Sequence, residues 1–314
     1  MIRVLVTDGM AKNAIEELKT KGFEVVEQFY EPEALGEQLK EFDVIVVRSK
    51  TKVRQPIIDK AVEAGRLKLI IRGGVGVDNI DVAYATEKGI EVSNTPNASS
   101  ASVAELALAH MFAVSRFVNI SNVSMRQGKW DSEKYEGVEI GGRTLGLVGF
   151  GRISRELAKK ASALDMEVIY TNLTGKVMGC DEYEFCKLND LLKRADYVSL
   201  HIPFIKEKGV TIGKEQLAMM KDGSFLINCA RGGLVDEVAL VEALDNGKLA
   251  GVGVDVFVDE PTKNETLVNH PKVSVTPHIG GATKEAQMRV GTEIVNIICD
   301  FFKNRLIAEY NRVV

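Results

Sequence analysis

The stretch TLGLVGFGRISRELAKKASAL, residues 144–164, decides the fold. An apolar strand runs into Gly149-Phe150-Gly151, and a segment with apolar residues at helical spacing follows. Between a strand and a helix, this spacing is the dinucleotide-binding fingerprint: Gly149 permits the tight turn, and Gly151 lets the backbone approach a pyrophosphate at the helix N-terminus. Ser154 takes the third glycine position, where a small side chain still serves helix–strand packing. The alternative is a tight turn that binds no ligand.

Short apolar strands alternate with helical segments on both sides of this turn, which indicates parallel sheets covered on both faces. We therefore predict an α/β protein with two Rossmann-like domains, each a doubly wound parallel sheet, and an active site in the cleft between them. Residues 99–127 form one long predicted helix that crosses between the domains. The predicted boundaries are 1–98 with 286–314 for a discontinuous substrate-binding domain, and 99–285 for the dinucleotide-binding domain. Strands are expected at 3–6, 23–28, 43–47, 67–71 and 90–93, and again at 143–150, 166–172, 196–202, 224–230, 250–257 and 272–278.

Composition narrows the possible partners. The 314 residues carry a formal net charge of −4 without a basic cluster, so a nucleic-acid partner is not expected. No apolar run approaches the ~20 residues that span a bilayer, and the N-terminus does not have the pattern of a signal peptide. We expect a cytoplasmic protein with no membrane partner. The four cysteines lack CxxC spacing, so neither a metal site nor a disulfide is expected.

Three polar residues follow strands of the second predicted sheet. Arg231 follows residues 224–230, Glu260 follows 250–257, and His278 ends the stretch 272–278. Carboxyl ends of parallel strands meet at one edge, where ligands bind. There His278 can act as the acid/base, with Glu260 raising its basicity and fixing its tautomer, while Arg231 binds a carboxylate and polarises a carbonyl. Singly, each has an ordinary alternative: a packing histidine, a surface arginine or a loop acid.

The residue that follows the second strand of this sheet bears on the cofactor. The fingerprint places an acid there to bind the ribose of NAD, but this chain has Asn172. An amide still hydrogen-bonds a hydroxyl without repelling a 2′-phosphate, and Thr174 and Lys176 lie nearby. We predict NAD as the cofactor, with NADP possible, because no arginine directly follows Asn172.

Several longer motifs occur in an order that resembles the D-isomer-specific 2-hydroxyacid dehydrogenases over nearly the whole chain. Within that family the chain is most similar to the phosphoglycerate dehydrogenases. Since it ends at Val314, we expect a short form without the C-terminal regulatory domain of longer relatives. The matching stretches are VRSKTKV (47–53), GGVGVDNID (73–81), SVAELALAHM (102–111), LVGFGRIS (147–154), INCARGGLVDE (227–237), VDVFVDEP (254–261) and PHIGG (277–281).

The resemblance implies hydride transfer between a nicotinamide cofactor and a D-2-hydroxy acid, with Arg231, Glu260 and His278 as the catalytic residues. It also implies that Asp255 meets the nicotinamide carboxamide, that the backbone of Val75 and Gly76 holds the substrate carboxylate, and that the cofactor domains form a homodimer. Further cofactor contacts are expected from Arg152, Ile153, His201, Pro203, Cys229, Ala230, Gly280 and Gly281.

Two arginines at strand ends of the first predicted sheet suggest the substrate. Arg48 and Arg72 follow neighbouring strands, and a phosphate favours planar, bidentate donors. We therefore expect 3-phosphoglycerate, oxidised to 3-phosphohydroxypyruvate for serine biosynthesis. The acidic segment Asp131-Ser132-Glu133, where phosphoglycerate dehydrogenases typically carry basic residues, favours the alternative of a hydroxypyruvate, glyoxylate or other 2-oxo acid reductase. A more remote alternative is a nucleotide-sensing binding protein similar to the co-repressors that share this fold.

Overall fold

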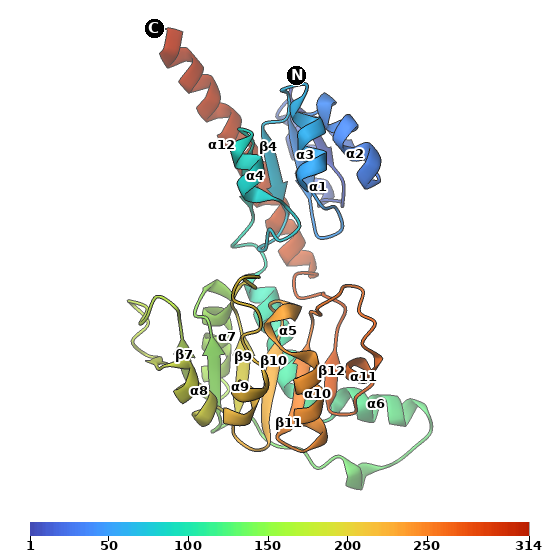
Figure 1. Ribbon diagram of the computed structural model, residues 1–314, viewed down its shortest axis with the longest axis vertical. Coiled ribbons are helices and arrows are strands. Elements are labelled where there is room, and N and C mark those ends of the chain that lie inside the picture. Colours follow the sequence, from blue (N-terminus) through green and yellow to red (C-terminus); the bar gives the residue numbers. More distant parts are fainter. Residues whose placement is uncertain (314) are drawn as a thin grey trace. The chain divides into compact units, whose positions relative to one another are not determined.

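The computed structural model describes the backbone of residues 1–313 and the side chains of residues 1–303. The chain divides into two compact units. Unit 1 comprises Met1–Ser99 and Gly281–Val314, and unit 2 comprises Ser100–Gly280. Figure 1 labels elements of both where there is room, and each unit is described separately below.

Unit 1 is built on a five-stranded parallel sheet of order β2-β1-β3-β4-β5. The order reverses between β1 and β3, which makes their carboxyl ends the topological switch point where doubly wound sheets bind ligands. The strands are β1 (Arg3–Val6), β2 (Glu24–Glu27), β3 (Val44–Val47), β4 (Leu69–Arg72) and β5 (Glu91–Asn94).

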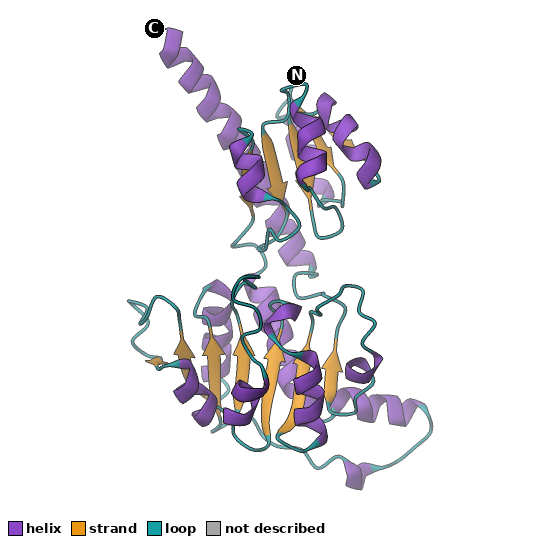
Figure 2. Ribbon diagram, viewed as in Figure 1, coloured by secondary structure: helices purple, strands orange, loops and turns teal. Residues whose placement is uncertain are grey.

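Helices cover both faces of this sheet, as Figure 2 shows. Because successive side chains of a strand point to opposite faces, the buried runs of β3 and β4 supply apolar side chains to both layers. One core cluster joins the sheet to α2 (Pro32–Gln38), α3 (Gln55–Val62) and α4 (Val82–Glu87). The other joins it to α1 (Lys12–Thr20) and to the last helix, α12 (Lys284–Val313).

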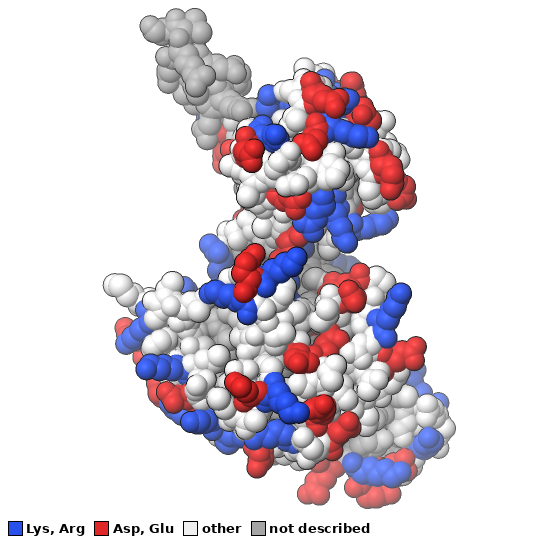
Figure 3. Space-filling view, viewed as in Figure 1, with Lys and Arg blue, Asp and Glu red and all other residues white. Residues whose placement is uncertain are grey.

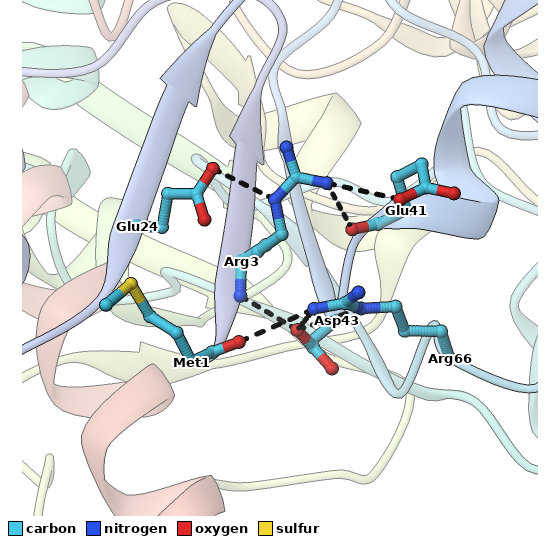
Figure 4. Close-up of polar contacts among 6 residues, drawn as sticks. All are labelled: Met1, Arg3, Glu24, Glu41, Asp43 and Arg66. Atoms are coloured by element: carbon cyan, nitrogen blue, oxygen red, sulfur yellow. Dashed lines mark hydrogen bonds and ion pairs between the residues drawn. The ribbon is translucent and has the colours of Figure 1, made fainter.

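A polar network lies at the amino ends of β1, β2 and β3 (Figure 4). The carboxylate of Asp43 accepts hydrogen bonds from the backbone amide of Arg3 at 2.8 Å and from Arg66 at 3.1 Å. The guanidinium of Arg3 also donates to Glu24 at 3.0 Å. Since ligands bind at the opposite, carboxyl edge of such sheets, we interpret this network as structural.

Unit 2 is built on a seven-stranded parallel sheet of order β12-β11-β10-β9-β6-β7-β8. The order reverses between β6 and β9, so this sheet too has a switch point, and the glycine turn follows β6. The strands are β6 (Thr144–Val148), β7 (Glu167–Thr171), β8 (Glu184–Phe185), β9 (Tyr197–Leu200), β10 (Ser224–Asn228), β11 (Leu249–Val254) and β12 (Val273–Val275).

Two apolar clusters again flank the sheet. One lies beneath α5 (Ser100–Ser115) and α7 (Arg152–Ser162). The other lies beneath α8 (Leu188–Arg194), α9 (Lys214–Met219), α10 (Glu237–Asp245) and α11 (Glu265–Val268). The predicted fold class, α/β with two doubly wound parallel sheets, is confirmed.

The prediction of one continuous helix over 99–127 is wrong. The segment forms α5, which ends at Ser115, and α6 (Val118–Arg126), and Phe117 between them has a left-handed backbone with φ 54°. Neither Gly nor Pro marks the break, so the sequence pattern contains no sign of it. The ring of Phe117 lies 6.0 Å from that of Tyr135, a contact with a residue beyond the end of α6.

No single described helix has the length and apolarity needed to cross a membrane; the bent pair α5 and α6, at 64°, passes that test only when its two helices are joined. On the face drawn in Figure 3, Lys and Arg side chains are interspersed with Asp and Glu in both units.

Candidate functional site

The glycine turn of unit 2 has the geometry that close approach of a phosphate requires. Gly149 has φ 91°, and a Cβ there would lie 2.7 Å from the carbonyl oxygen of His201, so only glycine fits. Gly151 precedes α7, and a Cβ on it would meet no atom within 4 Å. The fully buried Ser154 donates to the carbonyl oxygen of Gly151 at 3.0 Å. The turn therefore fits a pyrophosphate at the N-terminus of α7, where Arg152 and Ile153 lie.

A cavity of about 310 Å³ continues from the turn along the carboxyl ends of β6, β7 and β9. Asn172, Pro203 and Lys208 are among its lining residues. The amide of Asn172 donates to Thr174 at 2.9 Å, whereas Lys176 is bound to the carboxylate of Asp181 at 2.6 Å. A nucleoside at this edge would therefore meet a neutral amide.

Two predicted cofactor residues in this region are kept uncharged by burial. Desolvation lowers the pKa of His201 to about 4, and its Nε2 lies 2.9 Å from Ser199 Oγ. Desolvation also raises the pKa of the Cys229 thiol, and the charge of Asp255 adds to that effect. At physiological pH, His201 is therefore a neutral imidazole and Cys229 a thiol.

The loop after β12 brings His278 into contact with Glu260. His278 Nδ1 lies 2.7 Å from Glu260 Oε2, and each side chain is about one-third exposed. Burial alone would raise the pKa of Glu260, but its hydrogen bond to His278 and the charges of His278 and Arg231 outweigh this and lower it. The carboxylate is thus ionised beside the imidazole. His278 itself has a left-handed backbone, with φ 52°.

Arg231 lies in a loop that contacts the segment leading to Glu260. Asn228 fixes this loop, since its side chain donates to the carbonyl oxygen of Arg231 at 2.8 Å and accepts from the amide of Ala230 at 3.1 Å. A Cβ on Gly232 would lie 1.9 Å from the carbonyl carbon of Phe257, so the two loops touch at bare backbone. The structure thus brings Arg231, Glu260 and His278 together, as their positions in the sequence predict.

Asp255 is almost fully buried, and its carboxylate faces the loop that carries His278. Oδ1 accepts from the amide of Ile279 and Oδ2 from that of Gly280, both at 2.8 Å. The Thr276 hydroxyl donates to Oδ1 at 2.6 Å. The carboxylate therefore organises this loop, and its contact with a nicotinamide stays a prediction. Gly281 is the first residue of the second segment of unit 1.

Arg48 lies at the switch point of unit 1. It lines a cavity of about 370 Å³ together with Asp8, Lys50 and residues of the neighbouring strand ends. Asp8 Oδ2 accepts from the amides of Arg48 at 2.7 Å and Thr51 at 2.9 Å, which fixes the turn after β3. Sequence reasoning missed Asp8, although its position directly after β1 at the sheet's carboxyl edge is the signal that identifies such residues.

The other residues of unit 1 that we expected at the substrate lie in the loop after β4. Arg72 packs against the backbone of Gly74. A Cβ on Gly74 would overlap the guanidinium of Arg72. The carbonyl oxygen of Val75 accepts from the side chain of Asn94 at 2.5 Å, and Gly76 follows at an intermediate level of exposure. Among the described residues, no group of three His, Cys, Asp or Glu side chains is arranged to hold a metal ion.

These features define unit 2 as a dinucleotide-binding domain of the doubly wound class, with a hydrogen-bonded histidine and glutamate at its carboxyl edge. Residues 108–280 match the model of the D-isomer specific 2-hydroxyacid dehydrogenase, NAD binding domain family. The chain belongs to that family, as its sequence motifs predicted.

Two relatives match over almost all of this chain. The D-3-phosphoglycerate dehydrogenase of Methanocaldococcus jannaschii is 42% identical over 98% of this chain and 58% of its own length. The hydroxypyruvate reductase of Thermotoga maritima is 44% identical over 94% of this chain and 97% of its own length. The chain thus spans little more than half of the first relative and nearly all of the second.

Solved structures agree with this assignment. A D-lactate dehydrogenase from Aquifex aeolicus, complexed with NAD and lactic acid, superposes with a TM-score of 0.83 at 30% identity, and the match covers 96% of each chain.

Proposed function

We propose that this protein is an NAD-dependent D-2-hydroxyacid dehydrogenase whose substrate is 3-phosphoglycerate, which it oxidises to 3-phosphohydroxypyruvate. In this proposal unit 2 binds the dinucleotide, and Arg48, Val75 and Gly76 of unit 1 contact the substrate. The observation that carries it is the 2.7 Å contact of His278 with an ionised Glu260, next to the loop of Arg231.

The chemistry divides among a few side chains. When bound, NAD accepts the hydride that leaves C2 of the hydroxy acid. Because Glu260 holds Nδ1 of His278, Nε2 is the ring nitrogen left to take the hydroxyl proton as the carbonyl forms. Arg231 binds the substrate carboxylate and, in the reverse direction, polarises the carbonyl. Glu260 stabilises the imidazolium while it carries that proton.

NAD is proposed over NADP on local grounds. Lys176, the cation nearest in sequence to Asn172, is bound to Asp181, which leaves it poorly placed to pair a 2′-phosphate. Asn172 has hydrogen-bonding capacity for the ribose hydroxyls, and Lys208 on the same cavity is the feature that would favour NADP.

The substrate assignment rests on the cations of unit 1. Arg48 and Lys50 line one cavity at the switch point, where a phosphate would find a planar bidentate donor and a second positive charge. Asp8 lines the same cavity. Its carboxylate accepts hydrogen bonds from backbone amides of the turn, so the carboxylate is not committed to the side chains of Arg48 and Lys50.

Reduction of hydroxypyruvate is the second candidate. Its support is the Thermotoga maritima relative, named hydroxypyruvate reductase, which this chain matches along 97% of that protein's length. The acidic Asp131-Ser132-Glu133 points the same way, because the resemblance to phosphoglycerate dehydrogenases leads us to expect basic residues at these positions.

Steady-state kinetics with phosphorylated and unphosphorylated substrates separates the two. Arg48→Ala should lower kcat/KM for 3-phosphohydroxypyruvate by about 10- to 100-fold, the value of a charge-assisted bidentate contact, and change hydroxypyruvate reduction much less. Arg66→Ala, at the amino ends of the same sheet, is the matched control and should affect neither. Equal losses on both substrates, or a wild type that prefers hydroxypyruvate, would overturn the phosphate assignment.

We also propose a cytoplasmic homodimer. Several large apolar side chains on or near α6 are at least one-third exposed: Phe112, Val118, Val123, Met125 and Trp130. In Figure 1, α6 and the loop after it extend to one side of the unit 2 sheet. We propose that a second copy of the chain covers this apolar surface, because most soluble oligomers are symmetric homo-oligomers. The cytoplasmic location is supported by the four free cysteines, which suit a reducing compartment. Val123→Lys should yield monomers by sedimentation; an unchanged assembly state would contradict this surface.

A further inference from the structure

A buried histidine outside the proposed catalytic set lies at the end of a hydrogen-bonded chain that leads to the His278 loop. His110 is on α5 and is 2% exposed. Its Nδ1 lies 2.9 Å from Ser274 Oγ, and its Nε2 lies 3.0 Å from Thr276 Oγ1. Both ring nitrogens are therefore engaged by side chains that flank Val275, the last residue of β12.

The imidazole of His110 packs closely against Gly253, which has no side chain. A Cβ on Gly253 of β11 would lie 2.5 Å from the Cβ of His110 and 2.9 Å from its Cγ. Helix α5 therefore packs on the bare backbone of β11 at this point, and the imidazole has little room to move. Ser102, nearer the start of α5, also donates to the carbonyl oxygen of Gly280 at 2.6 Å.

The hydrogen bonds have one consistent direction. Thr276 has a single hydroxyl proton, and its shortest contact is with a carboxylate oxygen of Asp255, which can only accept. Thr276 Oγ1 must then accept from His110, which places a proton on Nε2. Burial lowers the pKa of His110, although the charge of Asp255 opposes this, so the ring is neutral and Nδ1 accepts from Ser274.

The hydrogen-bonded chain ends at Asp255, which shapes the loop that carries His278. Besides holding Ile279 and Gly280 through its carboxylate, Asp255 accepts the amide of His278 on its backbone carbonyl at 2.8 Å. His278 has φ 52°, a strained conformation for a residue with a Cβ, which persists only when its surroundings impose it. Loss of the hydrogen bond between His110 and Thr276, or between Thr276 and Asp255, would weaken the restraint on the backbone of His278.

We infer that His110 is a positioning residue: as the Nε2–H tautomer, it orients Thr276 and Asp255 and thereby holds His278 against Glu260. The kinetic consequences rest on the proposed dehydrogenase function, whereas the tautomer and the restraint of residues 276–280 do not.

The tautomer is tested directly by 15N NMR on the wild-type protein. The chain has four histidines, so each signal is assigned by one substitution. Between pH 6.5 and 8.5, we expect the Nε2 of His110 to show the shift of a protonated nitrogen and Nδ1 that of an unprotonated one. A protonated Nδ1 with a bare Nε2 would overturn the inference.

The positioning role is tested with two variants of His110 and a matched control. His110→Phe keeps the ring but removes both hydrogen bonds, and His110→Gln restores a donor and an acceptor. His270→Phe is the control, because His270 lies just before β12, at the opposite end of the same strand. Should His110→Phe fail to fold, Thr276→Val removes the same link while conserving volume.

For His110→Phe or Thr276→Val, we expect the amides of Ile279 and Gly280 to exchange about tenfold faster, the equivalent of one lost hydrogen bond. We expect kcat to fall about 10- to 100-fold with a much smaller change in the Kd for NAD, since a loop displaced by ~1 Å misplaces the base while the glycine turn keeps its geometry. His110→Gln should recover most of both, and His270→Phe should alter neither. Unchanged exchange in the loop, or a loss of activity without rescue by the His110→Gln variant, would refute the positioning role. Faster exchange in a protein that turns over no 2-hydroxy acid would refute the proposed function and support this inference.

Discussion

Replacing Glu260 by glutamine keeps the shape and one hydrogen-bonding oxygen but removes the charge beside His278. At the observed 2.7 Å, two unit charges attract by about 1.5 kcal/mol in a dielectric like that of water. Both side chains are about one-third exposed, so this limit applies, and measured pairs of this kind fall at or below ~1 kcal/mol. We therefore assign about 0.5 to 1.5 kcal/mol to the attraction between Glu260 and the charged ring. Loss of this attraction corresponds to a displacement of the pH profile by roughly half a pH unit to one unit.

The direction follows from the roles of the two groups. The pKa of Glu260 is lowered, so its carboxylate carries a negative charge beside the ring that takes up the proton. In oxidation, His278 must be neutral to accept the proton. In the Glu260→Gln variant a neutral amide replaces the carboxylate, so a positive charge on the ring loses its attractive partner. The acid limb of the kcat/KM profile therefore moves down by the amount above.

The assay is a pH series of NAD reduction, from about pH 5 to 10, at saturating cofactor. Glu237→Gln is the control, because Glu237 accepts from the amide of Val258 at 3.0 Å just as Glu260 accepts from that of Phe257 at 3.2 Å, yet Glu237 makes no described contact with His278. A profile that stays in place in Glu260→Gln, or moves equally in Glu237→Gln, would refute the reasoning.

Three further predictions follow from the site. His278→Ala and Arg231→Ala should each lower kcat by about 10²–10⁴-fold while NAD binding, followed by calorimetry, stays within a few-fold of the wild type; near-normal turnover in either would remove that residue from the mechanism. Asn172→Asp should weaken NADP binding about tenfold or more and leave NAD binding intact, because a carboxylate repels a 2′-phosphate; equal effects on both cofactors would show that this residue does not reach the ribose. The pKa of His201 falls from 6.5 to about 4 on folding, so the unfolded state takes up the proton first as the pH falls. Up to about 3 kcal/mol of stability should therefore be lost between pH 6.5 and 4. Urea titrations at several pH values check this, and His201→Asn should flatten the dependence of stability on pH.

The sequence allowed the alternation of strands and helices, and hence both parallel sheets, to be predicted, because apolar runs of about four to six residues bounded by turn residues are local signals. The gathering of Arg231, Glu260 and His278 was predictable for a related reason: parallel strands bring their carboxyl ends to one edge. Their contacts agree with that rule, and their catalytic roles remain predictions.

Features set by long-range packing were not predictable. The break at Phe117 depends on a left-handed residue that is neither Gly nor Asn, and the ring of Phe117 contacts Tyr135 beyond the end of α6. The partners of His110 lie 164 and 166 residues away, and no local pattern links a helix residue to the end of the last strand. Similarly, the packing of Arg72 against Gly74 depends on how the loop after β4 folds back.

The discontinuity of unit 1 has a consequence for biosynthesis. Residues 100–280 form unit 2 from one uninterrupted stretch, so that unit can fold as soon as it leaves the ribosome. Unit 1 cannot be completed so early, because the cluster that contains Val4 and Leu18 also needs Ile294 and Ile298 of α12. Until α12 has been made, one apolar face of the sheet formed by the first 99 residues is covered only in part, by α1. During that interval the growing chain is at its most vulnerable to aggregation, and a chaperone that shields apolar surface would act on this segment.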